Sequence, residues 1–128
     1  MPAYIVERTQ DILNERKIAL NGARILLLGV TYKANIADQR ESPAADIARK
    51  FQRKGAEVSF HDPYVQNWRA VPGVDRVESP VDSASHVDIV VLLQHHSEYD
   101  IDQIVDSSTS FFDTRGASPL GAANVHRL

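Results

Sequence analysis

The chain has 128 residues, which suffices for one domain with a single hydrophobic core but not for two. Hydrophobic residues make up 43% of the sequence and charged residues 24%, as in soluble globular proteins, and the net charge of -3 argues against the clustered basic surface that binds nucleic acid. Cysteine is absent, which excludes disulfides, thiolate metal sites and a cysteine nucleophile. Neither a membrane span nor a secretory signal is recognisable, so we expect a cytoplasmic protein with no membrane partner.

The first predicted element is a long amphipathic helix over residues 2 to about 20. Pro2 suits the first helical turn, and Asn21-Gly22 is a good stop signal. One face carries apolar and small residues at helical spacing, namely Ile5, Thr9, Ile12 and Leu13. This face has two alternative uses, covering the sheet of the same domain or packing on another chain.

A β-α-β unit is predicted next. The uninterrupted apolar run within residues 24–30 is typical of a parallel strand covered on both faces. Ser42 as a cap and Pro43 at the first helical position indicate the start of a helix. A second strand begins at residues 58–60 and is closed by Asp62-Pro63, so we expect a right-handed crossover between two parallel strands.

Strands and helices continue to alternate in the second half of the chain. In order, we expect a short helix over 65–70, an edge strand at 77–78, a helix over 79–85, a buried strand over 87–93, a loop over 94–100, a helix over 101–105 and a strand over 110–113. The segment from Ser118 onward is predicted to be a loosely held tail. This alternation predicts an α/β fold, a Rossmann-like three-layer α-β-α sandwich with a mainly parallel sheet.

The turn after the first strand is the best candidate for a ligand site. Residues 29–43 place two cations, Lys33 and Arg40, beyond the carboxyl end of a strand, where open α/β sheets bind their ligands. Gly29 is the only glycine of this turn, so the three-glycine fingerprint of dinucleotide-binding folds is missing. Side chains would have to hold a phosphate instead, lysine as a mobile point charge and arginine as a planar fork.

Two other polar features have structural interpretations that we favour. Asp62 ends the second strand, where a Rossmann fold would hold a ribose hydroxyl, but the missing fingerprint and the proline that follows favour a turn role. His95 and His96 suggest a metal site, yet adjacent residues in a strand-like register point to opposite sides and no third ligand is evident. We therefore predict no metal site and no catalytic residue.

Several motifs in fixed order resemble one protein family. They are the Tyr-Lys pair and the Arg-Glu-Ser-Pro sequence within 29–43, Gly-Ala-Glu-Val at 55–58, Asp-Pro-Tyr-Val at 62–65, the strand and His-His-Ser-Glu-Tyr loop at 91–99, and Asp-Thr-Arg at 113–115. Together they closely resemble the C-terminal UDP-binding domain of the UDP-glucose/GDP-mannose dehydrogenase family. The Glu-Ser-Pro sequence most resembles that of the bacterial branch that acts on UDP-N-acetylhexosamines.

The resemblance implies roles for individual residues. Lys33 would contact the UDP-sugar, with Tyr32 beside the nucleotide, and Arg115 would contact the UDP-sugar from the end of the last strand. Arg40 would reach the pyrophosphate of NAD bound by another domain.

Without the wider motif, we would interpret Lys33 and Arg40 as exposed ion-pair partners of Asp38 and Glu41. With the motif we favour ligand contacts for the two cations, and structural roles in the turn for the two acids.

The resemblance also implies a function for the whole protein. Family members oxidise the C6 alcohol of a nucleotide sugar to an acid in two NAD-dependent steps, a reaction of polysaccharide biosynthesis, with a glycine-rich N-terminal domain and a cysteine that forms a thioester. This chain has neither, so we expect a UDP-sugar-binding part that is not catalytically competent alone, with NAD bound mainly by the absent N-terminal domain. The alternative is a non-catalytic interaction or regulatory α/β module; an independent flavodoxin-like regulator is weaker still.

Three regions follow from this resemblance. Residues 1–22 would be the remnant of a central helix that builds the subunit contact of a homodimer, residues 23–117 the UDP-sugar-binding α/β domain, and residues 118–128 a flexible tail. The implied partners are a UDP-sugar, the N-terminal NAD-binding domain and a second subunit.

Overall fold

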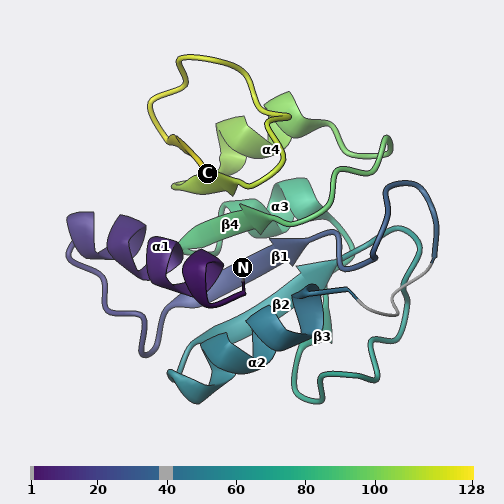
Figure 1. The fold of residues 1–128 in the computed structure, drawn as a ribbon. Coiled ribbons are helices and arrows are strands. Elements are labelled where there is room, and N and C mark those ends of the chain that lie inside the picture. The colour runs from purple at the N-terminus through teal and green to yellow at the C-terminus, as the bar shows by residue number, and fades with distance from the viewer. Residues whose placement is uncertain (1, 38–41) are drawn as a thin grey trace.

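The computed structural model describes residues 2–37 and 42–128 as a parallel sheet between two layers of helices (Figure 1). The six strands have the order β3-β2-β1-β4-β5-β6, and each neighbouring pair is parallel. This confirms the predicted α/β sandwich. The elements are α1 (Pro2–Glu15), β1 (Arg24–Leu28), α2 (Ala44–Arg53), β2 (Glu57–His61), β3 (Asp75–Arg76), α3 (Pro80–Ala84), β4 (Ile89–Leu92), α4 (Ile101–Ser107), β5 (Phe111–Asp113) and β6 (Val125–Arg127).

The central strands are buried on both faces because successive side chains of a strand point to opposite sides. Ile25 and Leu27 of β1 face a core shared with α1 and α2, whereas Leu26 and Leu28 face a second core shared with α3 and α4. Figure 1 shows the same arrangement, with α1 and α2 on one side of the sheet and α3 and α4 on the other. The uninterrupted apolar run of β1 thus serves two cores at once.

Helix α1 packs in the predicted way but ends earlier than predicted. Its buried residues are Ile5, Val6, Thr9, Ile12 and Leu13, which cover α2 and the sheet. The helix stops at Glu15 rather than near residue 20, because Lys17 adopts a left-handed conformation with φ of 60°. The amides of Lys17 and Ile18 donate to the carbonyls of Asn14 and Leu13 at 2.9 and 3.0 Å, which is a Schellman C-cap.

The other predicted elements of the β-α-β unit are present. Ser42 Oγ accepts a hydrogen bond from the amide of Ala44 at 3.2 Å, and Pro43 has helical dihedral angles but is the N-cap of α2, so the helix begins one residue later than predicted. Residues 65–70, however, form an irregular loop with a turn at 69–70 rather than the predicted short helix, and Val65 and Trp68 anchor this loop in the core. The edge strand lies at Asp75–Arg76, two residues before its predicted position.

The end of the chain is held more firmly than the prediction of a loose tail allows. Strand β6 pairs in parallel with β5, and Ala122 and Val125 pack against the second core. The side-chain nitrogen Nδ2 of Asn124 donates to the carbonyls of Val105 and Ser108 at 2.8 and 2.9 Å, which ties this segment to the end of α4. This last segment therefore completes the sheet.

No helix within residues 2–37 and 42–128 has both the length and the apolar character that a bilayer crossing requires.

Candidate functional site

The strand order places a topological switch point, where a ligand crevice is expected in such sheets, between β1 and β4. Chain connections run to one side from β1 through β2 to β3, and to the other side from β4 through β5 to β6, so the order reverses between β1 and β4. In open parallel sheets such a switch point, at the carboxyl ends of the strands, is the usual ligand site. The loops that follow β1 and β4 flank it, and they contain the predicted residues Tyr32 and Lys33 as well as both adjacent histidines.

Gly29 allows these two loops to touch. Its φ is +78°, and a Cβ atom at this position would lie 2.2 Å from the carbonyl oxygen of Gln94. The Gly29 amide donates to the carbonyl of His61 at 3.0 Å, which ties the same point to β2. The glycine is required for close approach of two backbones rather than for phosphate binding.

A buried pair, Asp62 and His96, joins the loops that follow β1, β2 and β4. Both side chains are fully buried, and His96 Nε2 lies 2.9 Å from Asp62 Oδ2. The same carboxylate accepts hydrogen bonds from the amides of Val30 and Tyr64, each at 2.8 Å. The carboxylate oxygens of Asp62 point into the protein, and their hydrogen bond with the Tyr64 amide closes a turn. The predicted turn role of Asp62 is therefore confirmed.

The hydrogen bonds of His96 identify its tautomer. Its Nδ1 accepts from the amide of Asn35 at 2.8 Å, so the ring hydrogen is on Nε2 and is donated to Asp62. Thr31 Oγ1 lies 3.1 Å from the same Nε2 and donates its own proton to the carbonyl of Lys33 at 2.8 Å. The pair is therefore a hydrogen bond of a neutral imidazole to a carboxylate, and it organises the loop after β1.

Tyr32 and Lys33 lie on this organised loop with their side chains exposed. Tyr32 is 49% exposed, and its carbonyl accepts from Gln94 Nε2 at 2.9 Å. The main chain at both positions is fixed by neighbours, while the side chains of both residues are exposed. Arg40, and with it Asp38 and Glu41, lies outside the described residues.

Arg115 follows β5, the neighbour of β4, and is exposed at the same edge of the sheet. Its turn is built on Asp113, whose carboxylate accepts from the amides of Arg115, Gly116 and Ser118 at 2.8 Å and from Ser118 Oγ at 2.5 Å. Burial alone would raise the pKa of Asp113, but the hydrogen bonds from Ser118, Arg115 and Gly116 together outweigh it and lower the pKa. The position of Arg115 thus depends on an ionised, buried carboxylate.

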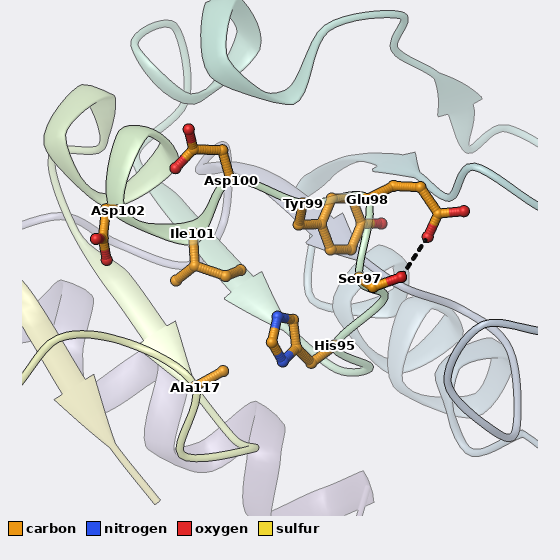
Figure 2. A pocket seen from close by; sticks show the side chains of 8 residues that line it. All are labelled: His95, Ser97, Glu98, Tyr99, Asp100, Ile101, Asp102 and Ala117. Carbon is orange, nitrogen blue, oxygen red and sulfur yellow. Dashed lines mark hydrogen bonds between the residues drawn. The ribbon is translucent and has the colours of Figure 1, made fainter.

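A pocket of 480 Å³ opens beside the loop after β4 (Figure 2). Its lining comes from this loop, from the start of α4 and from the turn after β5, and consists of His95, Ser97, Glu98, Tyr99, Asp100, Ile101, Asp102 and Ala117. Figure 2 shows His95 between Ser97 and Glu98 on one side and Asp100 and Asp102 on the other. The described lining residues include acids but neither lysine nor arginine, so this pocket does not suit the phosphates of a ligand.

His95 and His96 point in different directions, as their adjacent positions predict, since His95 is exposed and His96 is buried. Among residues 2–37 and 42–128, no group of three or more potential ligands is arranged to hold a metal ion. Sequence reasoning missed the role of His96 and its partners Thr31 and Asn35, and it missed Gln94, which holds the Tyr32 carbonyl. The sequence did offer one signal for the pairing of Asp62 with His96. Each of the two residues follows a strand, β2 or β4, that lies next to β1.

Comparison with known proteins identifies the family. Residues 26–118 match the model of the UDP-glucose/GDP-mannose dehydrogenase family, UDP binding domain. The chain belongs to this family. Its predicted membership is thereby confirmed, and the exposed loop at the switch point is part of a UDP-binding domain.

Individual relatives agree with this assignment. The chain is 34% identical over 101 residues to a UDP-N-acetyl-D-glucosamine 6-dehydrogenase of Pseudomonas aeruginosa, and 32% identical over 99 residues to a UDP-N-acetyl-D-mannosamine dehydrogenase of Methanocaldococcus jannaschii. Both matches cover 77% of this chain, but only 24% and 21% of the respective relative. The chain therefore corresponds to about a quarter or less of these enzymes.

Solved structures show the same fold. The UDP-N-acetyl-mannosamine dehydrogenase of Staphylococcus aureus superposes with a TM-score of 0.73 at 28% identity, over 99% of this chain and 30% of that one. An NDP-N-acetyl-D-galactosaminuronic acid dehydrogenase of Methanosarcina mazei superposes with a TM-score of 0.82 at 23% identity, over 100% of this chain and 28% of that one.

Proposed function

We propose that this domain binds the UDP part of a nucleotide sugar through Tyr32, Lys33 and Arg115. The observation that carries the proposal is the exposed Tyr32-Lys33 pair on a fixed loop at the switch point of a UDP-binding domain. The Lys33 ammonium group supplies a positive charge for the diphosphate, and Tyr32 offers an aromatic face to the nucleotide. Arg115 follows β5, two strands away from β1 at the same edge of the sheet, and would supply a planar donor for the phosphate or sugar.

The same crevice does not suit NAD. A Rossmann site needs a glycine-rich turn and an acid free to bind a ribose hydroxyl. Here the described part of the turn contains Gly29 alone, and Asp62 is fully buried in hydrogen bonds to Val30, Tyr64 and His96. This supports the proposal that a separate domain binds NAD. The contact of Arg40 with the NAD pyrophosphate is proposed from the family resemblance alone.

The proposed whole protein is an NAD-dependent UDP-sugar 6-dehydrogenase of polysaccharide biosynthesis, located in the cytoplasm. The relatives named for UDP-N-acetylhexosamines favour such a sugar as substrate. A homodimer joined through the first helix is part of the proposal, with the 49% exposed Tyr4 on the side of α1 that faces away from the core.

Calorimetric titration with UDP and UDP-N-acetylglucosamine tests the binding proposal. We expect weak binding by the isolated domain, and a loss of about tenfold in affinity for Lys33→Ala and for Arg115→Ala, since each removes one charge-assisted contact. Lys54→Ala is the matched control, because Lys54 is an exposed cation at the end of α2. Absence of binding at millimolar ligand, or equal affinities of the Lys33 and Lys54 variants, would favour a non-catalytic interaction module instead.

A further inference from the structure

The loop at residues 31–35 is fixed by polar contacts although it adds little to either core. Residues 32–37 are all exposed. Three contacts nevertheless dock the main chain and Asn35 onto the loop after β4: Gln94 Nε2 donates to the Tyr32 carbonyl at 2.9 Å, the Asn35 amide donates to His96 Nδ1 at 2.8 Å, and the Ser97 amide donates to Asn35 Oδ1 at 2.7 Å. The exposed side chains are thus carried on an immobilised backbone.

This docking depends on two buried polar side chains. Burying a carboxylate and an imidazole is unfavourable unless their polar atoms are paired, and the fully buried Asp62 and His96 pair with each other and with backbone amides. The exposed residues of the loop themselves contribute little hydrophobic stabilisation. The buried pair instead determines the shape of the loop, since its outward atom, Nδ1 of His96, holds the Asn35 amide.

We infer that Asn35 and His96 are positioning residues, which hold the loop in the conformation from which Lys33 contacts the nucleotide diphosphate. The inference rests on the proposed binding of UDP by Lys33. Asn35 is suited to the task because it adopts φ of 62°, a conformation that asparagine tolerates better than most residues, while both its amide and its side chain contact the loop after β4. If the loop were free, only a fraction of molecules would present Lys33 correctly, and the apparent affinity would fall by that fraction.

Asn35→Gly is the informative variant. Glycine accepts the left-handed conformation and keeps the backbone amide, but it removes the Oδ1 contact to Ser97. Asn35→Asp restores an acceptor at the same place and serves as the rescue variant. Asn67→Gly, at an exposed asparagine in the loop after β2, is the matched control. Changing His96 itself is less useful, because it would leave Asp62 buried without its partner and could unfold the domain.

Each variant is titrated with UDP in the natural background and in the Lys33→Ala background. We expect Asn35→Gly to lose about tenfold in affinity and Asn67→Gly to bind like the unaltered domain. Asn35→Asp should lose less than Asn35→Gly, because it restores the acceptor although its added negative charge repels the diphosphate. The loss caused by Asn35→Gly should disappear when Lys33 is already alanine. A loss that persists in the Lys33→Ala background would show that Asn35 does not act through Lys33. Unchanged affinity of Asn35→Gly would overturn the inference while leaving the proposed function intact.

Amide hydrogen exchange supplies a readout that needs no ligand. The Asn35 amide should be protected in the unaltered domain, and the amide at position 35 should exchange faster in Asn35→Gly but not in Asn67→Gly. An unprotected Asn35 amide in the unaltered domain would overturn the inference whatever the affinities are. Absence of UDP binding by the unaltered domain would overturn the proposed function and the inference together.

Discussion

Single residues decide whether the two loops of the crevice can meet. The backbone of Gly29 touches Gln94 so closely that even one methyl group has no room. Gly22 also has a positive φ, of 89°, but an added Cβ would meet nothing within 4 Å. Gly22 therefore requires glycine only for its positive φ. Gly29 requires it both for its positive φ and for the close approach of the Gln94 backbone.

This comparison gives a prediction at both positions. Gly22→Ala should lower the free energy of unfolding by about 1 kcal/mol, the cost of a left-handed alanine. Gly29→Ala should lower it by about 3 kcal/mol, because the clash with the Gln94 backbone adds to the same conformational cost. Urea denaturation of both variants measures the difference, and equal losses would show that the loops can separate without cost.

Asp113 makes stability depend on pH. Its pKa is lower in the folded chain than its ordinary value, so its contribution to stability is present above about pH 4 and is lost as the pH falls through the folded pKa. Asp113→Asn should therefore have a free energy of unfolding about 2 kcal/mol lower than the unaltered chain at pH 7. This difference should become smaller toward about pH 3. Denaturation across this range measures it, with Asp106→Asn, at an exposed acid of α4, as the charge control. A difference in the free energy of unfolding that does not change with pH would contradict the lowered pKa of Asp113.

At the scale of elements, the ends of the helices were harder to predict than their buried faces. The residues predicted for the apolar face of α1 are all buried, because helical spacing determines which side chains share a face. The predicted end of α1 was wrong because Lys17 forms the cap, and lysine has no particular preference for the left-handed conformation. Asn21-Gly22, the stop signal that the sequence offered, lies beyond a turn that the pattern does not reveal.

The cap of α1 can be improved. Lys17→Gly should raise the free energy of unfolding by about 0.5–1 kcal/mol, since glycine adopts a positive φ without strain. Lys54→Gly is the control, because Lys54 follows α2 with φ of -89° and gains nothing from glycine. Thermal unfolding of the two variants checks the sign, and a destabilised Lys17→Gly would contradict the Schellman cap.

Across the whole molecule, the sequence predicted what depends on local patterns and missed what depends on distant partners. The strands β1 and β4 were evident as continuous apolar runs. Strand β6 was not, because three residues, Val125–Arg127, become a strand only by pairing with β5. The position of the crevice followed from strand ends, whereas the difference between His95 and His96 depends on Asn35 and Asp62, far away in the chain.

The buried pair has a kinetic consequence for folding. Val30 and Asp62 are 32 residues apart, Asp62 and His96 are 34 apart, and Asn35 and His96 are 61 apart. Contacts across such separations must first offset the entropy lost on closing a long loop, so we expect them to form late in folding. The Asn35 contact requires β1, β2 and β4 to be in register together. A nascent or partly folded chain should therefore leave the loop at residues 31–35 undocked until the centre of the sheet is complete.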